Sequence, residues 1–332
     1  MATRSLQRSA LLLVLLIAVV AAPAAAGKKP PGKGGKHVLI VDDNKAQCAN
    51  AGFTSVQAAV NAAPAGSKIL VCAGTYNEQV TIATAAKNDL TLKAKGKPGT
   101  VVMNGADDPA LQAAFFLTAV QGIKLAGFTI REYHEAGILL GSPTGFPGFP
   151  SGAPGASGNK LLHNESTDNH HDGIALYNSP GNLIAHNFIH DNPSEIACGI
   201  QVGFPGSVGN VVRHNRSLRN AFGIRLNDGA SNNVIFHNRS SFNRRFGILN
   251  RAGATGTLII ENRTFSNTGT GTAPTEGRGI AVTTGSTGVS VLRNHAFFNT
   301  LDLFWDGTGS ATFAKNHCKT SIPSGLCAHG GK

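Results

Sequence analysis

An asparagine followed by a second asparagine five residues later recurs along the second half of the chain. The first asparagines are Asn164, Asn187, Asn215, Asn238, Asn262 and Asn294. The second ones are Asn169, Asn192, Asn220, Asn243, Asn267 and Asn299. Subtraction of neighbouring first positions gives steps of 23, 28, 23, 24 and 32 residues. A period near 23 residues that tolerates insertions predicts a solenoid, in which each repeat forms one coil of the chain.

The segments around these asparagines are typical of short strands. Stretches such as NVVRHN, NVIFHN and GIRL have apolar residues at alternate positions, are rich in Val and Ile, and are too short for helices. Three such strands and three turns make one coil, and strands of successive coils pair about 4.8 Å apart. Equivalent residues therefore form columns, and the pattern predicts an all-β protein with the architecture of a parallel β-helix solenoid.

A stacked asparagine suits a buried turn of this solenoid. It accepts a left-handed or bent backbone, and its amide bonds to the asparagines above and below, so that backbone groups at the turn keep partners. We therefore predict an asparagine ladder inside the solenoid. The glycine that precedes an isoleucine in these coils, as in Gly223-Ile224, is expected to allow a second tight turn.

The first 26 residues have the organisation of a secretory signal peptide. Arg4 and Arg8 precede the apolar run 10–20, and a cleavage site of the A-x-A type stands before Gly27. The apolar run is too short for a preferred membrane-spanning segment. Residues 1–26 are therefore expected to be removed, and the protein is expected to be secreted and extracellular, without stable membrane insertion.

The rest of the chain is expected to divide into a linker and one domain. Residues 27–36, GKKPPGKGGK, form a basic flexible linker, either a solvated spacer or an attachment to an anionic cell-wall or membrane surface. A solenoid grows linearly with chain length, so residues 37–332 are expected to be a single domain. Within it we expect an N-terminal cap at about 37–82, coils at about 83–310 and a C-terminal cap at 311–332.

The chain has five cysteines, an odd number for an exported protein. Cys48 and Cys72 flank an expected helix and the strand after it, while Cys318 and Cys327 bracket a short segment near the C-terminus. Each pair is expected to form a disulfide at one end of the solenoid. Cys198 is left over, and because it lies within a coil we expect a buried, unreactive thiol rather than a reactive one.

Two segments carry a resemblance to a known family. Residues 52–82, GFTSVQAAVNAAPAGSKILVCAGTYNEQVTI, contain a candidate N-cap, Thr54, followed by a short amphipathic helix over about 54–63 and a strand. This stretch, together with LAGFTIREYHEAGILL further on, resembles pectin-lyase-fold proteins, a group that contains pectate lyases, pectin methylesterases and polygalacturonases. The resemblance covers roughly residues 38–327.

The resemblance implies a right-handed parallel β-helix with an N-terminal capping helix. Such a helix would cover the open end of the first coil, which otherwise exposes core and unpaired backbone. The resemblance selects no activity, because this fold carries lyases, hydrolases, esterases, epimerases and non-catalytic surface proteins.

A dense basic surface is expected on the middle coils. Residues that flank the ladder asparagines should point outward if the asparagines point inward. Guanidinium groups pair bidentately with carboxylates, which favours recognition of an acidic polysaccharide, such as a uronate polymer, or of a cell-envelope glycan. Ordinary solubility and protection of strand edges are the alternative explanation. The arginines expected to bind substrate are Arg213, Arg216, Arg219, Arg225 and Arg239.

Candidate catalytic residues lie beside the second asparagines. Asp168, Asp191 and Arg219 each stand four residues after a first asparagine in three successive coils, and should share one column. The two carboxylates would then be about 5 Å apart, where repulsion raises one pKa and prepares a general acid beside a general base. Solvent-facing turn residues are the alternative.

The segment TDNHHDGIAL, residues 167–176, is the most polar part of the solenoid. It faintly resembles the Asp-Pro-His-Asp signature of mannuronan epimerases, with His171 and Asp172 at its last two positions. The chain departs from that signature before them, where His170 follows an asparagine. We include all three residues, His170, His171 and Asp172, among the catalytic candidates; simple turn chemistry at Asp172 is the alternative.

No metal or other cofactor is expected. Histidines that precede the first asparagines should point in one direction from parallel strands instead of converging on an ion, and acidic residues are sparse for a calcium cage. Export and the lack of a recognised module argue against a nucleic-acid partner, and we expect a monomer. Two functions remain open. One is a lyase, hydrolase or epimerase acting on an acidic polysaccharide, and the other is a non-catalytic envelope-binding or structural scaffold.

Overall fold

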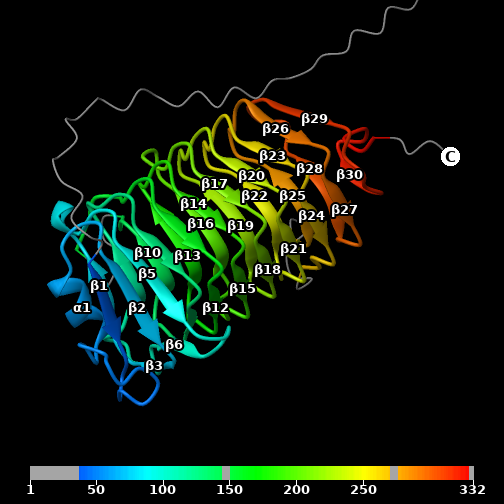
Figure 1. Ribbon diagram of the computed structural model, residues 1–332. Coiled ribbons are helices and arrows are strands. Elements are labelled where there is room, and N and C mark those ends of the chain that lie inside the picture. Colours follow the sequence, from blue (N-terminus) through cyan, green and yellow to red (C-terminus); the bar gives the residue numbers. More distant parts are fainter. Residues whose placement is uncertain (1–36, 144–149, 270–275, 329–332) are drawn as a thin grey trace, which may run out of the picture. The chain divides into compact units, whose positions relative to one another are not determined.

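Three parallel β-sheets form the framework of the described chain, which comprises residues 37–143, 150–269 and 276–328 of a computed structural model (Figure 1). The signal peptide predicted at 1–26 and the linker predicted at 27–36 lie outside these residues. Within the described ranges, no helix has the length and apolar character needed to cross a membrane.

We call the sheets A, B and C in the order in which a coil visits them. Sheet A consists of β1 (Val38–Val41), β2 (Lys68–Cys72), β5 (Thr91–Lys95), β8 (Lys124–Ala126), β11 (Lys160–Leu162), β14 (Leu183–Ala185), β17 (Val211–Arg213), β20 (Val234–Phe236), β23 (Leu258–Ile260), β26 (Val289–Leu292) and β29 (Ala311–Ala314). Sheet B consists of β3 (Gly74–Tyr76), β6 (Val101–Asn104), β9 (Thr129–Arg131), β12 (Glu165–Thr167), β15 (Phe188–His190), β18 (Arg216–Leu218), β21 (Arg239–Ser241), β24 (Arg263–Phe265) and β27 (His295–Phe297). Sheet C consists of β4 (Val80–Ile82), β7 (Ala113–Leu117), β10 (Ala136–Leu140), β13 (Asp172–Tyr177), β16 (Cys198–Gly203), β19 (Phe222–Asn227), β22 (Phe246–Asn250), β25 (Arg278–Val282), β28 (Leu301–Trp305) and β30 (Ser321–Ile322).

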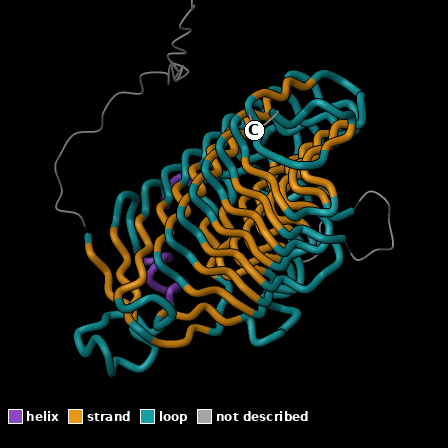
Figure 2. Tube along the Cα trace, turned by 90° about the vertical axis from the view of Figure 1, so that its right-hand side faces the viewer, coloured by secondary structure: helices purple, strands orange, loops and turns teal. Residues whose placement is uncertain are grey.

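Successive coils stack in register. Strands three apart in the chain pair in parallel, so that Arg216 lies beside Arg239 in sheet B and Ile200 lies beside Ile224 in sheet C. The tube view shows the strands of one coil beside those of the next along each sheet (Figure 2). The predicted parallel β-helix is confirmed, and equivalent residues form columns that run across the coils.

Aliphatic side chains fill the space between the three sheets. One strand residue of each middle coil in sheet A is fully buried, as at Ile184, Val212 and Ile235. The isoleucine of each Gly-Ile pair supplies the matching column in sheet C: Ile138, Ile174, Ile200, Ile224, Ile248 and Ile280. Burial of such a side chain stabilises the fold by about 1.5–3 kcal/mol.

Asparagine ladders line all three turns of the coil. The ladder between sheets A and B contains the predicted first asparagines and continues to Asn316. The ladder between sheets B and C contains the predicted second asparagines. A third ladder, which was not predicted, lies between sheets C and A and is formed by Asn159, Asn182, Asn210 and Asn233.

Each ladder asparagine bonds to its neighbour in two ways. The side-chain oxygen of Asn215 accepts hydrogen bonds from the backbone N–H of Asn187 at 2.9 Å and from its side-chain amide at 3.0 Å. The amide of Asn215 donates to the carbonyl of Ile184 at 2.8 Å and to Asn238 at 3.0 Å. The buried polar groups of the turn therefore find partners within the ladder.

The residue before each ladder asparagine has the left-handed conformation. The prediction that the asparagine itself would adopt it was wrong. At the turn between sheets A and B, His186 and His214 have φ of 58° and 55°, and at the next turn Asp191 and Arg219 have φ of 58° and 52°. Their side chains point outward, where no close packing opposes the conformation. The inward asparagine then joins the ladder.

The glycine of each Gly-Ile pair does not make a turn, and that expectation was wrong. Gly223 lies within β19, where a Cβ atom would overlap the hydroxyl of Ser240 and the carbonyl of Gly247 in the next coil. Ser240 donates to that same carbonyl at 2.7 Å. Glycine is needed here because the chain of one coil passes close to a side chain inside the next.

Helix α1 (Val56–Ala62) packs against β1, β2 and β4 at the end of the stack where the described chain begins (Figure 1). Its N-cap is Ser55, not Thr54 as expected, because the Ser55 hydroxyl accepts from the backbone N–H of Ala58 at 3.2 Å. Glu78 adds a carboxylate that accepts from the N–H groups of Val56 and Gln57. A short 3-10 helix, η1 (Ala85–Lys87), follows β4.

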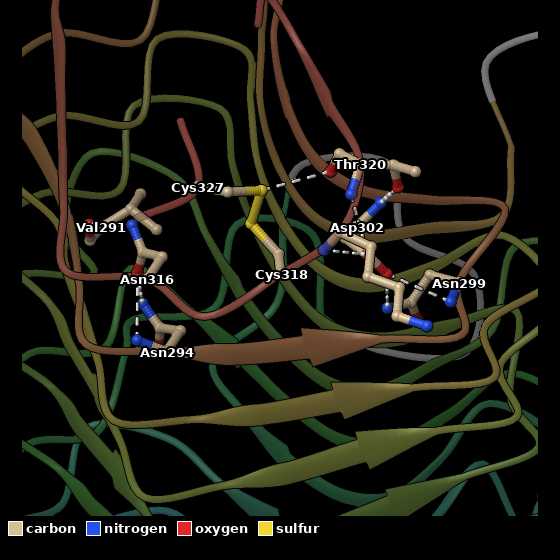
Figure 3. The surroundings of a disulfide bond; sticks show 9 residues. Val291, Asn294, Asn299, Asp302, Asn316, Cys318, Thr320 and Cys327 are labelled. Carbon is tan, nitrogen blue, oxygen red and sulfur yellow. Dashed lines mark hydrogen bonds between the residues drawn. A yellow bond between two sulfur atoms is a disulfide. The ribbon is translucent and has the colours of Figure 1, made fainter. Parts of the chain in front are cut away.

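Both predicted disulfides are confirmed. Cys48 bonds to Cys72, and Cys318 bonds to Cys327 next to the last coils (Figure 3). Cys198 is a free, fully buried thiol, as predicted. Asp302 accepts hydrogen bonds from the backbone N–H groups of Lys319 and Thr320, so the C-terminal segment is tied to the preceding coil by side-chain and covalent contacts.

Replacement of Asn215 by alanine tests the ladder. It removes the acceptor for Asn187 and the donor to Ile184 in a site that stays closed to water, and each buried group left unpaired costs about 1–3 kcal/mol. We expect the free energy of unfolding, measured in urea, to fall by at least about 2 kcal/mol. The matched control is His214→Asn, one residue earlier on the exposed side of the turn, which should unfold like the native chain. Equal stability of both variants would contradict the ladder's role.

Candidate functional site

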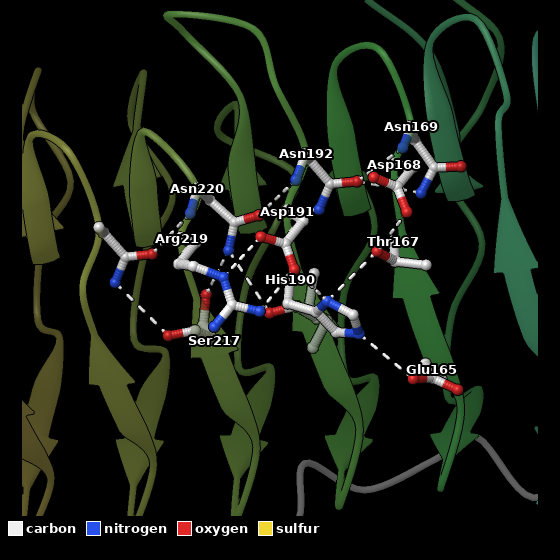
Figure 4. Close-up of polar contacts among 12 residues, drawn as sticks. Glu165, Thr167, Asp168, Asn169, His190, Asp191, Asn192, Ser217, Arg219 and Asn220 are labelled. Atoms are coloured by element: carbon white, nitrogen blue, oxygen red, sulfur yellow. Dashed lines mark hydrogen bonds and ion pairs between the residues drawn. The ribbon is translucent and has the colours of Figure 1, made fainter.

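Three of the predicted site residues meet at the turn between sheets B and C (Figure 4). Asp168, Asp191 and Arg219 occupy equivalent left-handed positions of three successive coils. Side chains from the ends of β12 and β15 join them. We call this group the turn cluster: Glu165, Thr167, Asp168, His190, Asp191 and Arg219.

Asp191 is at the centre of the turn cluster. The Nε and Nη2 atoms of Arg219 donate to its two carboxylate oxygens, both at 2.6 Å. His190 lies on the other side, with Nδ1 2.6 Å from Asp191 Oδ2 and Nε2 3.2 Å from Glu165 Oε1. Thr167 connects the coils, because its hydroxyl donates to Asp168 Oδ2 at 2.9 Å and lies 3.2 Å from His190 Nδ1.

The electrostatics of this column differ from those expected for two repelling carboxylates. The hydrogen bond from Arg219 lowers the pKa of Asp191; burial opposes this shift, and His190 reinforces it. Asp191 is therefore a carboxylate at neutral pH and holds Arg219 in place. A raised pKa was expected because a contact between Arg219 and the preceding coil was not foreseen. The guanidinium of Arg219 makes this contact, since it binds both carboxylate oxygens of Asp191.

The other catalytic candidates lie elsewhere. His170 points away from the turn cluster, with Nε2 3.0 Å from Asp107 Oδ1. His171 and Asp172 lie at the start of β13, on the outer face of sheet C. The five predicted catalytic residues therefore do not form one site.

Asp172 is part of a second group, which we call the buried polar cluster: His171, Asp172, Tyr177, Cys198, Gln201 and Arg225. Asp172 Oδ1 accepts from the backbone N–H of Cys198 at 2.7 Å and lies 3.2 Å from His171 Nδ1. The hydroxyl of Tyr177 donates to Asp172 Oδ2 at 3.4 Å. Gln201 Oε1 accepts from Arg225 Nε at 3.1 Å and from the Cys198 thiol at 3.2 Å.

The buried polar cluster holds opposite charges in a site with little water. Burial disfavours ionisation of Asp172, but His171, Arg225 and the backbone N–H of Cys198 together lower the pKa of the carboxyl. Burial likewise disfavours protonation of His171, yet the charge of Asp172 raises the pKa of the imidazole. Burial raises the pKa of the Cys198 thiol well above its ordinary value, so it is not a thiolate nucleophile at neutral pH.

Three members of this cluster, Tyr177, Cys198 and Gln201, were not among the predicted site residues, although a signal for two of them was present. Cys198 precedes a Gly-Ile pair as Asp172 does, and Gln201 follows one as Arg225 does. These two positions point outward from sheet C in every coil, and Gln201 pairs in register with Arg225. A comparison of the residues on either side of each Gly-Ile pair would have found both.

The remaining predicted arginines lie on two different sheets. Arg216 and Arg239 are adjacent on the outer face of sheet B, and Arg263 and His295 continue their column. We call these four residues the arginine face. Arg213 ends a strand of sheet A, beside the histidines of the turn, and is not part of this column.

Aromatic rings support the arginine face. The guanidinium carbon of Arg216 lies 4.8 Å from the ring centroid of Phe188, and that of Arg239 lies 4.4 Å from Phe265. Among the described residues, Arg216, Arg239 and Arg263 form no ion pair. Stacking on the rings holds cations in place while their edges remain available to a ligand.

Two adjoining grooves open on this face. One of about 410 Å³ is lined by His214, His237, Asn238, Arg239, Glu261, Arg263, Arg293 and His295. The other, of about 390 Å³, is lined by Arg239, Arg263, Thr264, Phe265, His295, Phe297 and Phe298. They share Arg239, Arg263 and His295, so a ligand could extend from the charged groove to the aromatic one. Phe297 and Phe298 were not among the site residues predicted from the sequence.

A histidine column borders the first groove. The rings of His163, His186 and His214 stack with centroids 5.0 Å apart, and His237 follows edge-on at 5.1 Å. The rings of the first three histidines lie parallel, with interplanar angles of 10° and 6°, and follow one another along the coils. Among the described residues, a set of ligand atoms close enough for an ion occurs at Asp42, Cys48 and Cys72, where the cysteines are bonded to each other.

A family model described as "Right handed beta helix region" matches residues 113–296, more than half of the chain. Solved structures of similar fold include the complex of XylC with xylose, with a TM-score of 0.61, 12% sequence identity, and coverage of 85% of this chain and 70% of that one. Pectate lyase Pel9A has a TM-score of 0.57 and 16% identity, over 90% of this chain and 82% of its own. The periplasmic alginate epimerase AlgG has a TM-score of 0.57 and 16% identity, over 77% of this chain and 61% of its own. No curated protein sequence matches the chain.

The histidine column makes stability sensitive to acid. Partial burial, neighbouring histidines and Arg213 lower the pKa of His186 and of His214. The unfolded chain then binds protons more readily than the folded one. The resulting stability is present above the ordinary histidine pKa of about 6.5 and is lost as the pH falls through the lowered values.

We therefore expect the melting temperature to fall between pH 7 and pH 5, and to fall less in the variant with His186→Asn and His214→Asn. Asparagine is chosen because it tolerates the left-handed backbone at both positions. His170→Asn, outside the column, is the control. An unchanged pH dependence in the double variant would contradict the assignment.

Proposed function

Because the chain belongs to the right-handed β-helix family, we propose that it binds an acidic polysaccharide along the arginine face of sheet B. One observation carries this proposal. Arg216, Arg239 and Arg263 lie in register on successive coils, without an ion pair to any described residue, and Arg239 and Arg263 line both grooves.

The spacing of the arginines suits a polymer. Strands of successive coils are about 4.8 Å apart, similar to the length of one sugar unit in an extended polysaccharide. A uronate polymer carries a carboxylate on each unit, and a guanidinium binds a carboxylate through two parallel hydrogen bonds. Repetition of this contact along the column adds affinity without a deep pocket.

The aromatic groove supplies the other half of sugar recognition. Phe265, Phe297 and Phe298 form an apolar wall next to the arginines, and the side chain of Phe298 is 71% exposed. The C–H face of a pyranose packs well on such rings. An exposed phenylalanine beside a row of cations is difficult to explain by solubility alone, and it favours a ligand with both apolar and anionic faces.

The comparisons support a polysaccharide ligand through the names of the similar structures, which include a pectate lyase and an alginate epimerase. Two disulfides and the predicted signal peptide support secretion into an oxidising compartment. The basic segment predicted at 27–36 would add to the attraction for an anionic cell envelope.

Processing of the polymer is a second candidate, favoured by the buried polar cluster. There, His171 lies 3.2 Å from Asp172 and is 20% exposed in its side chain. Arg225, two coils further on, is joined to Asp172 through Gln201 and Cys198 on the outer face of sheet C. Such a group could bind a carboxylate through Arg225 and move the neighbouring carbon-bound proton through the imidazole. Lyase and epimerase chemistry both begin with that step.

Binding is tested with a charge-matched pair of variants. We expect Arg239→Gln with Arg263→Gln to weaken binding of polygalacturonate or alginate at least about tenfold, because two charge-assisted contacts are lost. The salt dependence of binding should also become shallower. The control is Lys93→Gln with Lys160→Gln, which removes the same charge from exposed positions of sheet A. Equal weakening in both variants, or equal binding of a neutral glucan, would contradict a specific site on sheet B.

Processing is tested by incubation of the protein with the same polymers in D₂O. Absorbance of unsaturated products reports a lyase, reducing ends report a hydrolase, and loss of the C5 proton signal in NMR spectra reports an epimerase. Under this candidate we expect His171→Gln to lower the rate at least about a hundredfold and to leave polymer binding unchanged. If the native protein yields neither product nor proton exchange, the processing candidate is wrong and polysaccharide binding is the remaining proposal.

A further inference from the structure

Arg278 is a buried cation that forms no direct ion pair with any described residue. It begins β25 on the outer face of sheet C, and the residue is only 6% exposed. Within the described part of the chain, its guanidinium makes no hydrogen bond and no ion pair. Burial lowers the pKa of Arg278, and the charge of Asp306 opposes this shift.

Aromatic rings surround this guanidinium. Its central carbon lies 3.3 Å from the ring centroid of Phe304 and 5.9 Å from that of Phe246. Phe246 in turn stacks on Phe222, with centroids 5.6 Å apart and an interplanar angle of 7°. Cation–π contacts offset part of the cost of burying a charge, yet they leave the N–H groups of the guanidinium without acceptors.

Other partly buried arginines of the protein are compensated differently. Arg245, next to the same rings, lies 2.7 Å from a carboxylate oxygen of Glu276. Arg225, on the same face of sheet C, donates from Nε to Gln201 Oε1 at 3.1 Å. Arg278 is more buried than either and has no such partner, so a purely structural role does not account for its charge.

A groove of about 380 Å³ opens directly at this position. It is lined by Phe222, Arg245, Phe246, Leu249, Arg251, Arg278, Thr283, Thr284, Phe304 and Asp306. The acid in this lining, Asp306, is already engaged, because its carboxylate accepts from the backbone N–H groups of Thr284 at 2.6 Å and Thr308 at 2.9 Å. Asp306 acts on Arg278 through its charge and not through an ion pair, so the guanidinium N–H groups remain available to an anion that enters the groove.

We propose that this groove is a second ligand site, in which Arg278 binds the carboxylate of a single uronate unit and the phenylalanines contact the sugar ring. The choice of a uronate rests on the proposed function; the presence of an anion site does not. A uronate combines a planar carboxylate with an apolar C–H face, and the groove offers a guanidinium beside aromatic walls. Arg251 and Thr283 add polar groups at the lining for the sugar hydroxyls.

The site is tested by calorimetric titration of the full chain with trigalacturonate and with its neutral methyl ester. The Arg239→Gln/Arg263→Gln variant serves as the background, so that the arginine face does not contribute. In this background we expect one saturable site for trigalacturonate, binding of the ester weaker by at least about tenfold, and a similar loss on Arg278→Met. Binding that survives Arg278→Met would overturn the proposal.

Thermal unfolding without ligand separates a ligand site from a structural role. Methionine preserves apolar contact with Phe304 while it removes an uncompensated charge, so Arg278→Met should melt at the native temperature or above it. A melting temperature lowered by several degrees would show that Arg278 supports the fold, and would overturn the inference. Sulfate that binds as tightly as trigalacturonate would refute the sugar as ligand.

The two proposals fail in distinguishable ways. If the arginine face does not bind polymer, Arg239→Gln/Arg263→Gln will leave polygalacturonate binding intact, while Arg278→Met still abolishes trigalacturonate binding. If only the groove site is wrong, Arg239→Gln/Arg263→Gln will weaken polygalacturonate binding, while Arg278→Met will leave trigalacturonate binding unchanged.

Discussion

Hydrogen bonds between stacked asparagine side chains hold the turns of this protein, and the rest of the structure depends on them. A coil of three short strands must turn three times around a narrow apolar core. At each turn the backbone leaves the sheet ladder and would bury unpaired N–H and carbonyl groups. The amide of Asn215 meets this need by bonding to the coils on both sides, and the same arrangement repeats at the other two turns.

The ladders also decide where chemistry can occur. Because the asparagine turns inward, the residue before it adopts a left-handed backbone and projects outward, and the residues after it alternate between core and surface. The turn cluster, the arginine face and the histidine column are all consequences of this geometry. They are columns of outward positions, each displaced from a ladder by one residue or three.

The fold was predictable from the sequence because its determinants are periodic and local. The spacing of Asn215 and Asn220, repeated in five other copies, was sufficient for the parallel β-helix and two ladders. The third ladder had a signal in four of the six copies, where Asn159, Asn182, Asn210 and Asn233 each stand five residues before a first asparagine. It was missed because a glycine-asparagine pair is so common in turns that it did not stand out.

The candidate site was less predictable, because side-chain pairing depends on the neighbouring coil. Column alignment placed Arg219 beside Asp191 correctly, but the direction of the guanidinium, and hence the lowered pKa of Asp191, follows from a contact between coils. Arg278 was missed for a similar reason. Its isolation is visible only when the rings of Phe246 and Phe304 and the engaged carboxylate of Asp306 are seen around it.

The separation of inward asparagines from outward left-handed residues has an evolutionary consequence. His, Asp, Arg, Phe, Ser, Glu and Lys all occupy the left-handed positions in this one chain, at nearly the same backbone angle. A mutation at such a position changes the surface of one coil and leaves the interior untouched. Duplication or replacement of a coil can therefore lengthen or rewrite a binding column in steps of one rung, so that new specificities become accessible through variants that all still fold.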